Sequence, residues 1–428
     1  MYADDYAPEC FWTLDAPLPT APDAPLPEAV DVLIVGGGYT GLTAARETAL
    51  AGRSTLVVDA GGIGGGCSAR NGGQVAFSIK PGHGRLTSLH GSRVATRIYQ
   101  EGVEAVANLR SLARGEGLDF DWRDVGCFIG AHTPRLYGAL VHEAESQPQG
   151  FEAPFRVVPR ERQAEEIDTP RYHGGVVYPS DAAVHPAKLV RVLHARASAA
   201  GADFRAHCAV EALARTAEGF EVRTTRGVVR ARQVLVATNG YTGSFAPWHR
   251  RRILPIGSYI IATEPLDPAL VRRLIPHGRN IGDTRRVVVY YRPSPDGRRI
   301  LFGGRAAARE TDATRCVPRL RSMLAEIFPS LARVRISRAW MGFVGFTFDT
   351  LPHLGEDRGL YYCMGYCGQG VPSATYYGRK IGLTMAGRAG GETALAGLRF
   401  PARAFYTGDP WFLPAAVVGY RVRDALGL

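Results

Sequence analysis

The most regular hydrophobic pattern in the chain begins at Asp31 and forms one short unit. Residues 32–35 are an apolar, β-branched run that ends in glycines, and a small-residue pattern typical of a helix continues to Leu50. A second apolar run, 55–58, stops at Asp59. Strand, turn, helix and strand in this order predict one βαβ unit.

Beyond this unit the chain mixes helical and strand patterns. Helices are predicted over 92–114, from apolar spacing, and over 186–200, which opens with a proline. Strand patterns occur at 125–130, 176–179, 220–225, 234–238, 258–262, 287–291 and 300–302. The last three predict a largely antiparallel sheet in the middle of the chain. Six prolines within 7–27 predict an extended lead-in that lies over a domain surface.

Length and composition indicate a folded chain of two or three domains. It has 428 residues, of which 46% are hydrophobic, enough for a sizeable core. The net charge of +11 permits anionic partners. However, the densest basic run, Arg250–Arg252, is shorter than the blocks of about five or six that mark a nucleic-acid-binding arm. We therefore expect no nucleic-acid partner, and an RNA-binding function remains a minority alternative.

Cysteine spacing and hydropathy indicate the cellular compartment of the protein. The seven cysteines contain no CxxC pair, so we expect neither a disulfide framework nor a metal site, and a reduced cytoplasm is the expected compartment. Residues 1–12 do not resemble a secretory signal. No apolar run approaches the roughly 18 residues that span a bilayer, so we expect a soluble protein without a membrane partner.

The turn after the first strand carries the clearest binding motif. Gly36-Gly37-Gly38-Tyr39-Thr40-Gly41 fits GxGxxG between a predicted strand and a predicted helix, the context that supports a dinucleotide site. Gly36 permits the tight turn, Gly38 lets the backbone approach a pyrophosphate, and Gly41 allows close helix packing. Asp59 is placed to accept hydrogen bonds from a ribose. The polar run Ser68-Ala69-Arg70-Asn71-Gly72-Gly73-Gln74 follows, and its arginine suits a pyrophosphate.

This series of motifs resembles the D-amino-acid-oxidase-like superfamily of FAD enzymes, in its gamma-glutamylputrescine oxidoreductase-like branch. The likeness runs nearly end to end. It includes Thr238-Asn239-Gly240, residues 255–265, residues 302–305, residues 351–355 and the glycine loop 365–370. The motifs are specific for the family and much less specific for the substrate.

The resemblance implies an α/β fold: a Rossmann-like FAD-binding domain of the glutathione-reductase type and a second, antiparallel-sheet substrate domain. We assign 1–90, 150–245 and 335–428 to the first, and 91–149 and 246–334 to the second. FAD would bind in extended form. Gly368, Gln369, Gly370 and Val371 would hold its flavin end, because the helix starting there directs its positive dipole end at charge that develops on the flavin.

Four residues are candidates for the chemistry. Lys80 is one of only three lysines and would meet a substrate carboxylate or assist dioxygen reduction, unless it is a solvated surface residue. Arg305 could also meet a substrate carboxylate or assist dioxygen reduction, and the alternative is that it forms a structural ion pair. Tyr259, together with Tyr291 and Trp340, would wall the pocket or belong to the core. His353 would lie near the flavin, or satisfy a backbone carbonyl.

Two further expectations concern the flavin site. Relatives often carry histidine where Gln369 stands, so an acid–base role at this position lacks its usual side chain. Some amine oxidases of the superfamily attach FAD through a cysteine in the strand that corresponds to 340–346, which contains none here, so we expect noncovalent FAD.

The expected activity is oxidation of a C–N bond in a small amine or amino acid by hydride transfer to FAD, with dioxygen as acceptor and hydrogen peroxide as product. A gamma-glutamylputrescine-like substrate fits the branch. The alternatives are a dehydrogenase with another electron acceptor, an RNA-binding or RNA-modifying flavoprotein, and a scaffold that holds FAD without turnover. Oligomeric state is left open.

Overall fold

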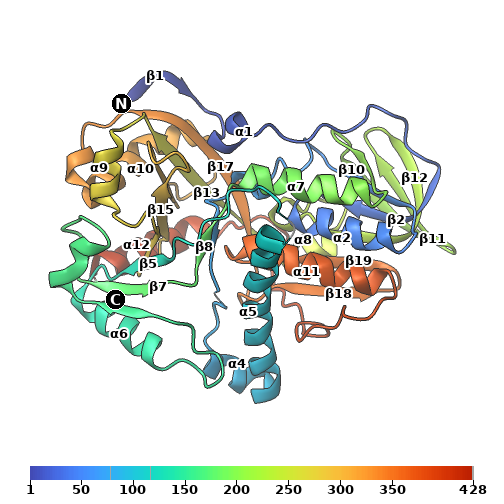
Figure 1. Cartoon of the computed structure of the whole chain (residues 1–428). Helices are drawn as coiled ribbons and strands as arrows, with labels where there is room; N and C mark the ends of the chain where they lie inside the picture. The colour runs from blue at the N-terminus through green and yellow to red at the C-terminus, as the bar shows by residue number, and fades with distance from the viewer. Residues whose placement is uncertain (78, 116, 427–428) are drawn as a thin grey trace.

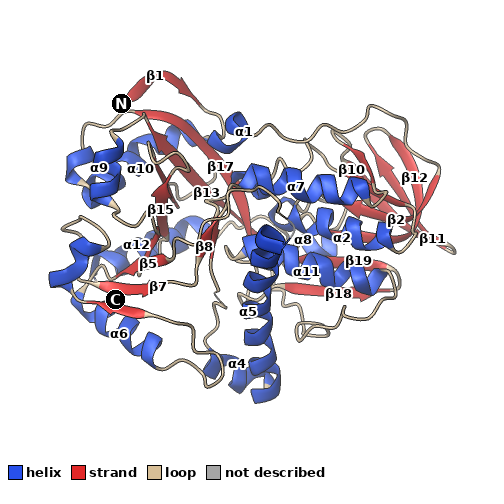
Figure 2. Cartoon of the chain, in the orientation of Figure 1, coloured by secondary structure: helices blue, strands red, loops and turns tan. Residues whose placement is uncertain are grey.

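Two large sheets dominate the computed structural model of this protein, which describes residues 1–77, 79–115 and 117–426. Figure 1 shows one sheet on the right, with β2, β10, β11 and β12, and the other on the left, with β13, β15 and β17. Helices lie around both sheets (Figure 2). The expected α/β class with a second, mainly antiparallel sheet is confirmed.

The first sheet contains the predicted βαβ unit. Its order is β10 (Val210–Thr216), β11 (Gly219–Thr224), β12 (Gly227–Val236), β2 (Ala29–Val35), β3 (Thr55–Val58) and β9 (Asp203–Arg205), and β19 (Leu360–Met364) joins β12 to β18 (His353–Asp357). Strands β19, β12, β2, β3 and β9 run parallel. The apolar residues at the centre of the sheet, 32–35, 56–58 and 234–236, are buried, as expected for parallel strands covered on both faces.

Helices cover this sheet through small residues. Helix α2 (Tyr39–Leu50) packs between α7 (Pro186–Ala199) and α11 (Gly370–Met385). A Cβ on Gly378 of α11 would lie 2.6 Å from the carbonyl oxygen of Thr40, and one on Gly382 would lie 2.9 Å from the Cα of Ala44. The two helices can therefore approach closely only because these positions lack side chains.

The second sheet runs β1 (Tyr2–Ala7), β17 (Ile336–Phe346), β13 (Leu254–Thr263), β16 (Ile300–Gly304), β15 (Val289–Pro293), β14 (Asn280–Asp283), β5 (Cys127–Gly130), β7 (Gly175–Tyr178) and β6 (Arg156–Val158). All pairs are antiparallel except β1 with β17 and β14 with β5. A two-stranded ladder of β4 (Gln74–Val75) and β8 (Ala182–Ala183) lies apart from both sheets.

Of the nine remaining helices in the described part of the chain, five are short, with at most eight residues, and four are longer. They are α1 (Phe11–Asp15), α3 (Cys67–Arg70), α4 (His83–His90), α5 (Ser92–Gly115), α6 (Pro134–Glu145), α8 (Pro247–Arg250), α9 (Pro268–Leu274), α10 (Ala313–Ile327) and α12 (Leu413–Leu426). Single 3₁₀ turns occur at Arg160–Glu165, Asn239–Tyr241 and Pro329–Leu331. No helix within the described residues is long and apolar enough to cross a membrane.

The assignment of strands to the two sheets differs from the division into domains that was expected from the sequence. Strands β1 and β17 belong to the second sheet, although residues 1–90 and 335–428 were assigned to the first domain, and so do β6 and β7. The lead-in over 7–27 is also not wholly extended. It forms helix α1 between Pro8 and Pro17, where the chain passes from the second sheet to the first (Figure 1).

Candidate functional site

A single large cavity of about 2190 Å³ lies between the two sheets. Its walls come from the carboxyl ends of β2 and β3, from the N-termini of α2 and α11, and from β13, β14 and β15 of the second sheet. Ligands of open α/β sheets bind at the carboxyl ends of the strands. Most of the residues proposed to hold the cofactor line this cavity, namely Gly36, Gly38, Tyr39, Thr40, Asp59, Ser68, Arg70, Asn71, Gly72, Gln74, Thr238, Asn239, Gly368, Gln369, Gly370 and Val371.

The glycine turn needs its glycines for two different reasons. Gly36 has φ +107°, and a Cβ there would lie 2.9 Å from the carbonyl oxygen of Ala237. Gly41 does not line the cavity, and a Cβ on it would collide with the carbonyl oxygen of Gly36. Gly41 therefore serves the packing of α2 on its own turn, while Gly38 keeps backbone exposed to the cavity next to Ser68.

Asp59 is held at the cavity edge by backbone donors. Its carboxylate accepts the N–H of Gly37 at 2.8 Å and the N–H of Gly61 at 2.9 Å. Burial raises the pKa of this carboxyl group, and the two N–H donors oppose that rise. The side chain is thus fixed beside the glycine turn, in the place from which the motif binds a ribose.

The polar segment after α3 is shaped by its own asparagine. The Asn71 amide donates to the carbonyls of Cys67 and Ser68, at 3.1 and 2.8 Å, and its Oδ1 accepts the N–H of Gly73 at 2.8 Å. Gly73 lies outside the cavity, with φ +68°, and its carbonyl accepts from buried Arg292 at 2.9 Å. Asn71 and Gly73 therefore set the path of the segment that presents Gly72 and Gln74 to the cavity.

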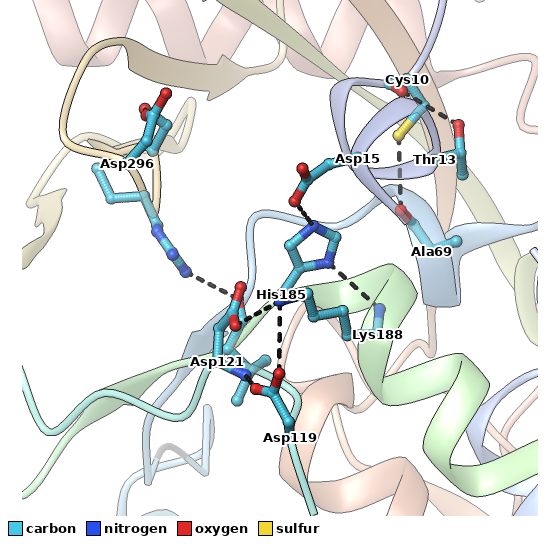
Figure 3. Close-up of polar contacts among 12 residues, drawn as sticks. Cys10, Thr13, Asp15, Ala69, Asp119, Asp121, His185, Lys188 and Asp296 are labelled. Atoms are coloured by element: carbon cyan, nitrogen blue, oxygen red, sulfur yellow. Dashed lines mark hydrogen bonds and ion pairs between the residues drawn. The ribbon is translucent and has the colours of Figure 1, made fainter. Parts of the chain in front are cut away.

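The N-terminal segment supports this path from outside the cavity. The indole of Trp12 donates to the carbonyl of Asn71 at 2.8 Å, and Cys10 donates its thiol to the carbonyl of Ala69. Figure 3 shows how the segment is anchored. The buried His185 imidazole lies 3.0 Å from the Asp15 carboxylate through Nε2, and its Nδ1 accepts the backbone N–H of Lys188.

Two loops far apart in the sequence meet at the flavin end of the site. Asn239, with φ +45°, accepts the N–H of Gly365 on its Oδ1 at 2.9 Å. Gly240 packs against Gly345 and Phe343 and does not line the cavity. The hydroxyls of Thr40 and Tyr366 are 2.5 Å apart, which joins α2 to the C-terminal loop.

The geometry fits FAD. The N-termini of α2 and α11 both face the cavity, and each carries partial positive charge. Between them the backbone is bare at glycines, and an acidic side chain stands where a ribose binds. The residues named above would hold the cofactor, with Ser68, Arg70 and Asn71 along its middle.

Lys80 lines the same cavity from the loop before α4. Its ammonium lies 5.5 Å from the centroid of the Phe346 ring. Removal from bulk water lowers its pKa, and the nearby Cys367 opposes this. Among the described residues no carboxylate pairs with it, and the residue as a whole is exposed.

Arg305 also lines the cavity, but its guanidinium is engaged. It pairs with Glu310 at 2.6 Å and donates to the carbonyls of Gly257 and Ala308 at 2.8 and 3.1 Å. The structural ion pair considered for this arginine is therefore present.

Two candidates lie outside the cavity. Tyr259 is fully buried in the core of the second sheet, where its hydroxyl donates to Glu310 at 3.0 Å. His353 is 1% exposed, pairs with Asp349 at 2.9 Å and stacks on Phe400. The placement of these two residues at the pocket was wrong, because each side chain points into packed protein. Tyr291 and Trp340 likewise do not line the cavity.

The cavity wall on strands β13 and β15 includes the sequence neighbours of Tyr259 and Tyr291. Tyr290 lines the cavity and its hydroxyl lies 2.9 Å from that of Ser258, which also lines it. Ser258 and Tyr290 each stand one residue before the predicted tyrosines. Because side chains alternate across a strand, an error of one position exchanges the cavity face for the core face.

The C-terminal helix supplies residues that sequence patterns did not indicate. Val417 and Tyr420 of α12 line the cavity. Asp424 fixes this helix by accepting the N–H groups of Arg286 and Val287 at 2.8 and 2.9 Å. The contact joins residues more than 130 positions apart, and no local motif marks it.

Known proteins resemble this chain over most of its length. The probable oxidoreductase OrdL of Rhizobium meliloti (strain 1021) is 31% identical, over 95% of both chains. Gamma-glutamylputrescine oxidoreductase of Escherichia coli (strain K12) is also 31% identical, over 93% of both chains. Among solved structures, glycine oxidase from Geobacillus kaustophilus matches with a TM-score of 0.71 at 20% identity, covering 88% of this chain and 99% of its own. That likeness supports the fold.

The family model described as "DAO: FAD dependent oxidoreductase" matches residues 31–382, from the first strand of the βαβ unit into α11. This span contains the glycine turn, Asp59, the polar segment and the C-terminal glycine loop, all of which border the cavity. The chain therefore belongs to the DAO family of FAD-dependent oxidoreductases.

Proposed function

We propose that this enzyme oxidises a C–N bond of a small amine or amino acid and uses dioxygen as the electron acceptor. The observation that carries the proposal is the continuity of the cavity. Most of the cofactor-binding residues and the sheet face with Ser258 and Tyr290 border one cavity, which Lys80 also lines. The 31% identity to a gamma-glutamylputrescine oxidoreductase over nearly the whole chain supports an amine substrate.

In the proposed reaction the carbon beside nitrogen loses a hydride and the nitrogen becomes an imine, which water hydrolyses to a carbonyl compound and an amine or ammonia. FAD, when bound, accepts the hydride, and dioxygen then takes up both electrons and two protons to give hydrogen peroxide. The chain itself orients the substrate and limits the access of water. Positioning of this kind supplies much of the rate when the bound amine is neutral.

Within this reaction we assign Lys80 to the dioxygen step. Its ammonium is a positive charge at the cavity wall, without a carboxylate partner among the described residues. Such a charge stabilises the negative charge that develops on dioxygen as it is reduced. Arg305 contributes through structure, because its two Nη atoms already bind Glu310 and two backbone carbonyls. FAD is held noncovalently, in a cytoplasmic enzyme.

Anaerobic titration tests the proposal. Purified yellow protein is mixed with polyamines, gamma-glutamyl amines and amino acids, and the flavin absorbance is followed. Bleaching by an amine, with peroxide formed after air is admitted, is the expected result. Bleaching without peroxide would identify a dehydrogenase with another acceptor. Salt-sensitive retention of RNA with no bleaching by any amine would contradict the proposal and support the RNA-binding alternative.

A further inference from the structure

The cavity has a second lobe beyond the part that suits the cofactor. This lobe is the part of the cavity bordered by α5, α6 and strands β5 and β7, and its walls include Tyr99, Cys127, Leu140, Tyr178 and Asp181. None of the residues proposed to bind FAD belongs to it. The sheet face that carries Ser258 and Tyr290 continues into it through Gly282 and Ile129, which also line the cavity.

A buried carboxylate faces this lobe. Asp181 is only 8% exposed, yet it lines the cavity. Among the described residues its side chain forms no ion pair. Burial raises its pKa to about 7, and the backbone N–H of Phe77, which donates to it, opposes this rise. Burying a carboxylate without a cationic partner is unfavourable, so its retention here indicates a partner that comes from outside the chain.

The surroundings of Asp181 suit a cation. Glu143 of α6 lines the same lobe. Burial raises the pKa of Tyr178 to about 12, and the negative charges of Glu143 and Asp181 add to this rise. Tyr99 adds a second aromatic ring to the wall. Carboxylates beside aromatic faces are the side chains that bind ammonium groups in proteins.

The arginine whose charge acts on Asp181 forms its contacts with other groups. Arg110 of α5 lines the lobe and lowers the pKa of Asp181 slightly, but it does not reach the carboxylate. Its guanidinium donates to the carbonyl of Ser180 at 2.6 Å, lies 3.5 Å from the carboxylate of Asp124 and covers the ring of Trp122. The charge of Asp181 is therefore left for a ligand.

We propose that Asp181, with Glu143 and Tyr178, forms a subsite for a second ammonium group at the far end of the substrate. This inference rests on the proposed amine oxidation and narrows its substrate class. The substrate would carry the oxidised C–N bond at one end and a cationic group at the other. An unmodified diamine or polyamine has such an end. A gamma-glutamyl amine also carries an α-ammonium group there, next to an α-carboxylate that Asp181 and Glu143 would repel.

The test compares substrates that differ only at the far end. Steady-state kinetics are measured with 1,4-diaminobutane, its gamma-glutamyl amide and n-butylamine, for the wild type and for Asp181→Asn. We expect the substitution to raise KM about tenfold or more for the substrate with a far ammonium group, with little change in kcat, because an uncharged amide no longer pairs with the cation. The KM for n-butylamine should stay within about twofold. The more affected of the first two substrates identifies the source of the ammonium group.

Controls separate the outcomes. Glu145→Gln removes the same charge from the end of α6, outside the cavity, and should leave all KM values unchanged. FAD content and thermal unfolding verify that Asp181→Asn folds. An equal change for all three substrates, or no change, would overturn the subsite. If no amine bleaches the flavin of the wild type, the proposed function itself fails, and the two results are distinct.

Discussion

At the scale of single residues, charges without partners mark the site better than residue type does. The histidine candidate, His353, contacts Asp349 and Phe400 in the protein interior, and the tyrosine candidate, Tyr259, binds Glu310. Lys80 and Asp181, by contrast, line the cavity and form no ion pair among the described residues. Isolated charges beside a cavity are costly for the fold. Such residues are therefore the ones whose substitution should change function without loss of stability.

The pKa of Asp181 gives a stability prediction. Its folded value of about 7 lies above the ordinary value of 3.8, so folding becomes less favourable as pH rises from about 4 to 7 and the buried carboxyl ionises. Asp181→Asn removes this cost. Thermal unfolding should show a higher Tm for the variant than for the wild type at pH 8, and little difference at pH 4.5. A lower Tm for the variant at pH 8 would show that the carboxylate has a stabilising partner.

Lys80 gives a kinetic prediction. Lys80→Met should slow reoxidation of the reduced enzyme by dioxygen about tenfold or more, because the fixed positive charge is lost, while anaerobic reduction by an amine changes much less. Stopped-flow measurement of the two half-reactions separates these effects. Lys380→Met, on α11 and outside the cavity, is the matched control. A slower reduction step with normal reoxidation would assign Lys80 to the substrate instead.

At the scale of elements, glycine positions decide how helices meet. The α2–α11 contact brings both helix N-termini to the cavity, and it requires Gly378 to lack a side chain. Gly378→Ala should displace α11 and weaken FAD binding, although alanine favours helix formation. Fluorescence titration of the apoprotein with FAD measures this. Gly138→Ala in α6, where a Cβ meets nothing within 4 Å, should leave FAD affinity unchanged and raise Tm slightly. Unchanged FAD affinity in Gly378→Ala would contradict the packing argument.

At the scale of the whole molecule, FAD would contact segments from residue 36 to residue 371 and so join parts of the chain that are distant in sequence. A ligand that binds only the folded state stabilises it, by about 2.7 kcal/mol at a concentration of 100 times Kd. Removing FAD should therefore lower Tm, and adding it back should restore Tm. Acid precipitation should release all flavin into the supernatant if, as we propose, the attachment is noncovalent. Flavin retained in the pellet would show a covalent bond.

The sequence by itself determined the features that depend on local spacing. The βαβ unit and the glycine turn were predicted because the strands, the glycine loop, the helix and Asp59 all lie within 31–59. Helices 92–114 and 186–200 were predicted because their apolar patterns are continuous. Only the tertiary structure decided which side of a strand faces the cavity. From the sequence, either Ser258 or Tyr259 could face the cavity. The pairing of β13 with β16 and β17 determines that Ser258 does. It also brought Asp181 and the C-terminal helix α12 to the cavity, since contacts between distant segments leave no periodic trace in the chain.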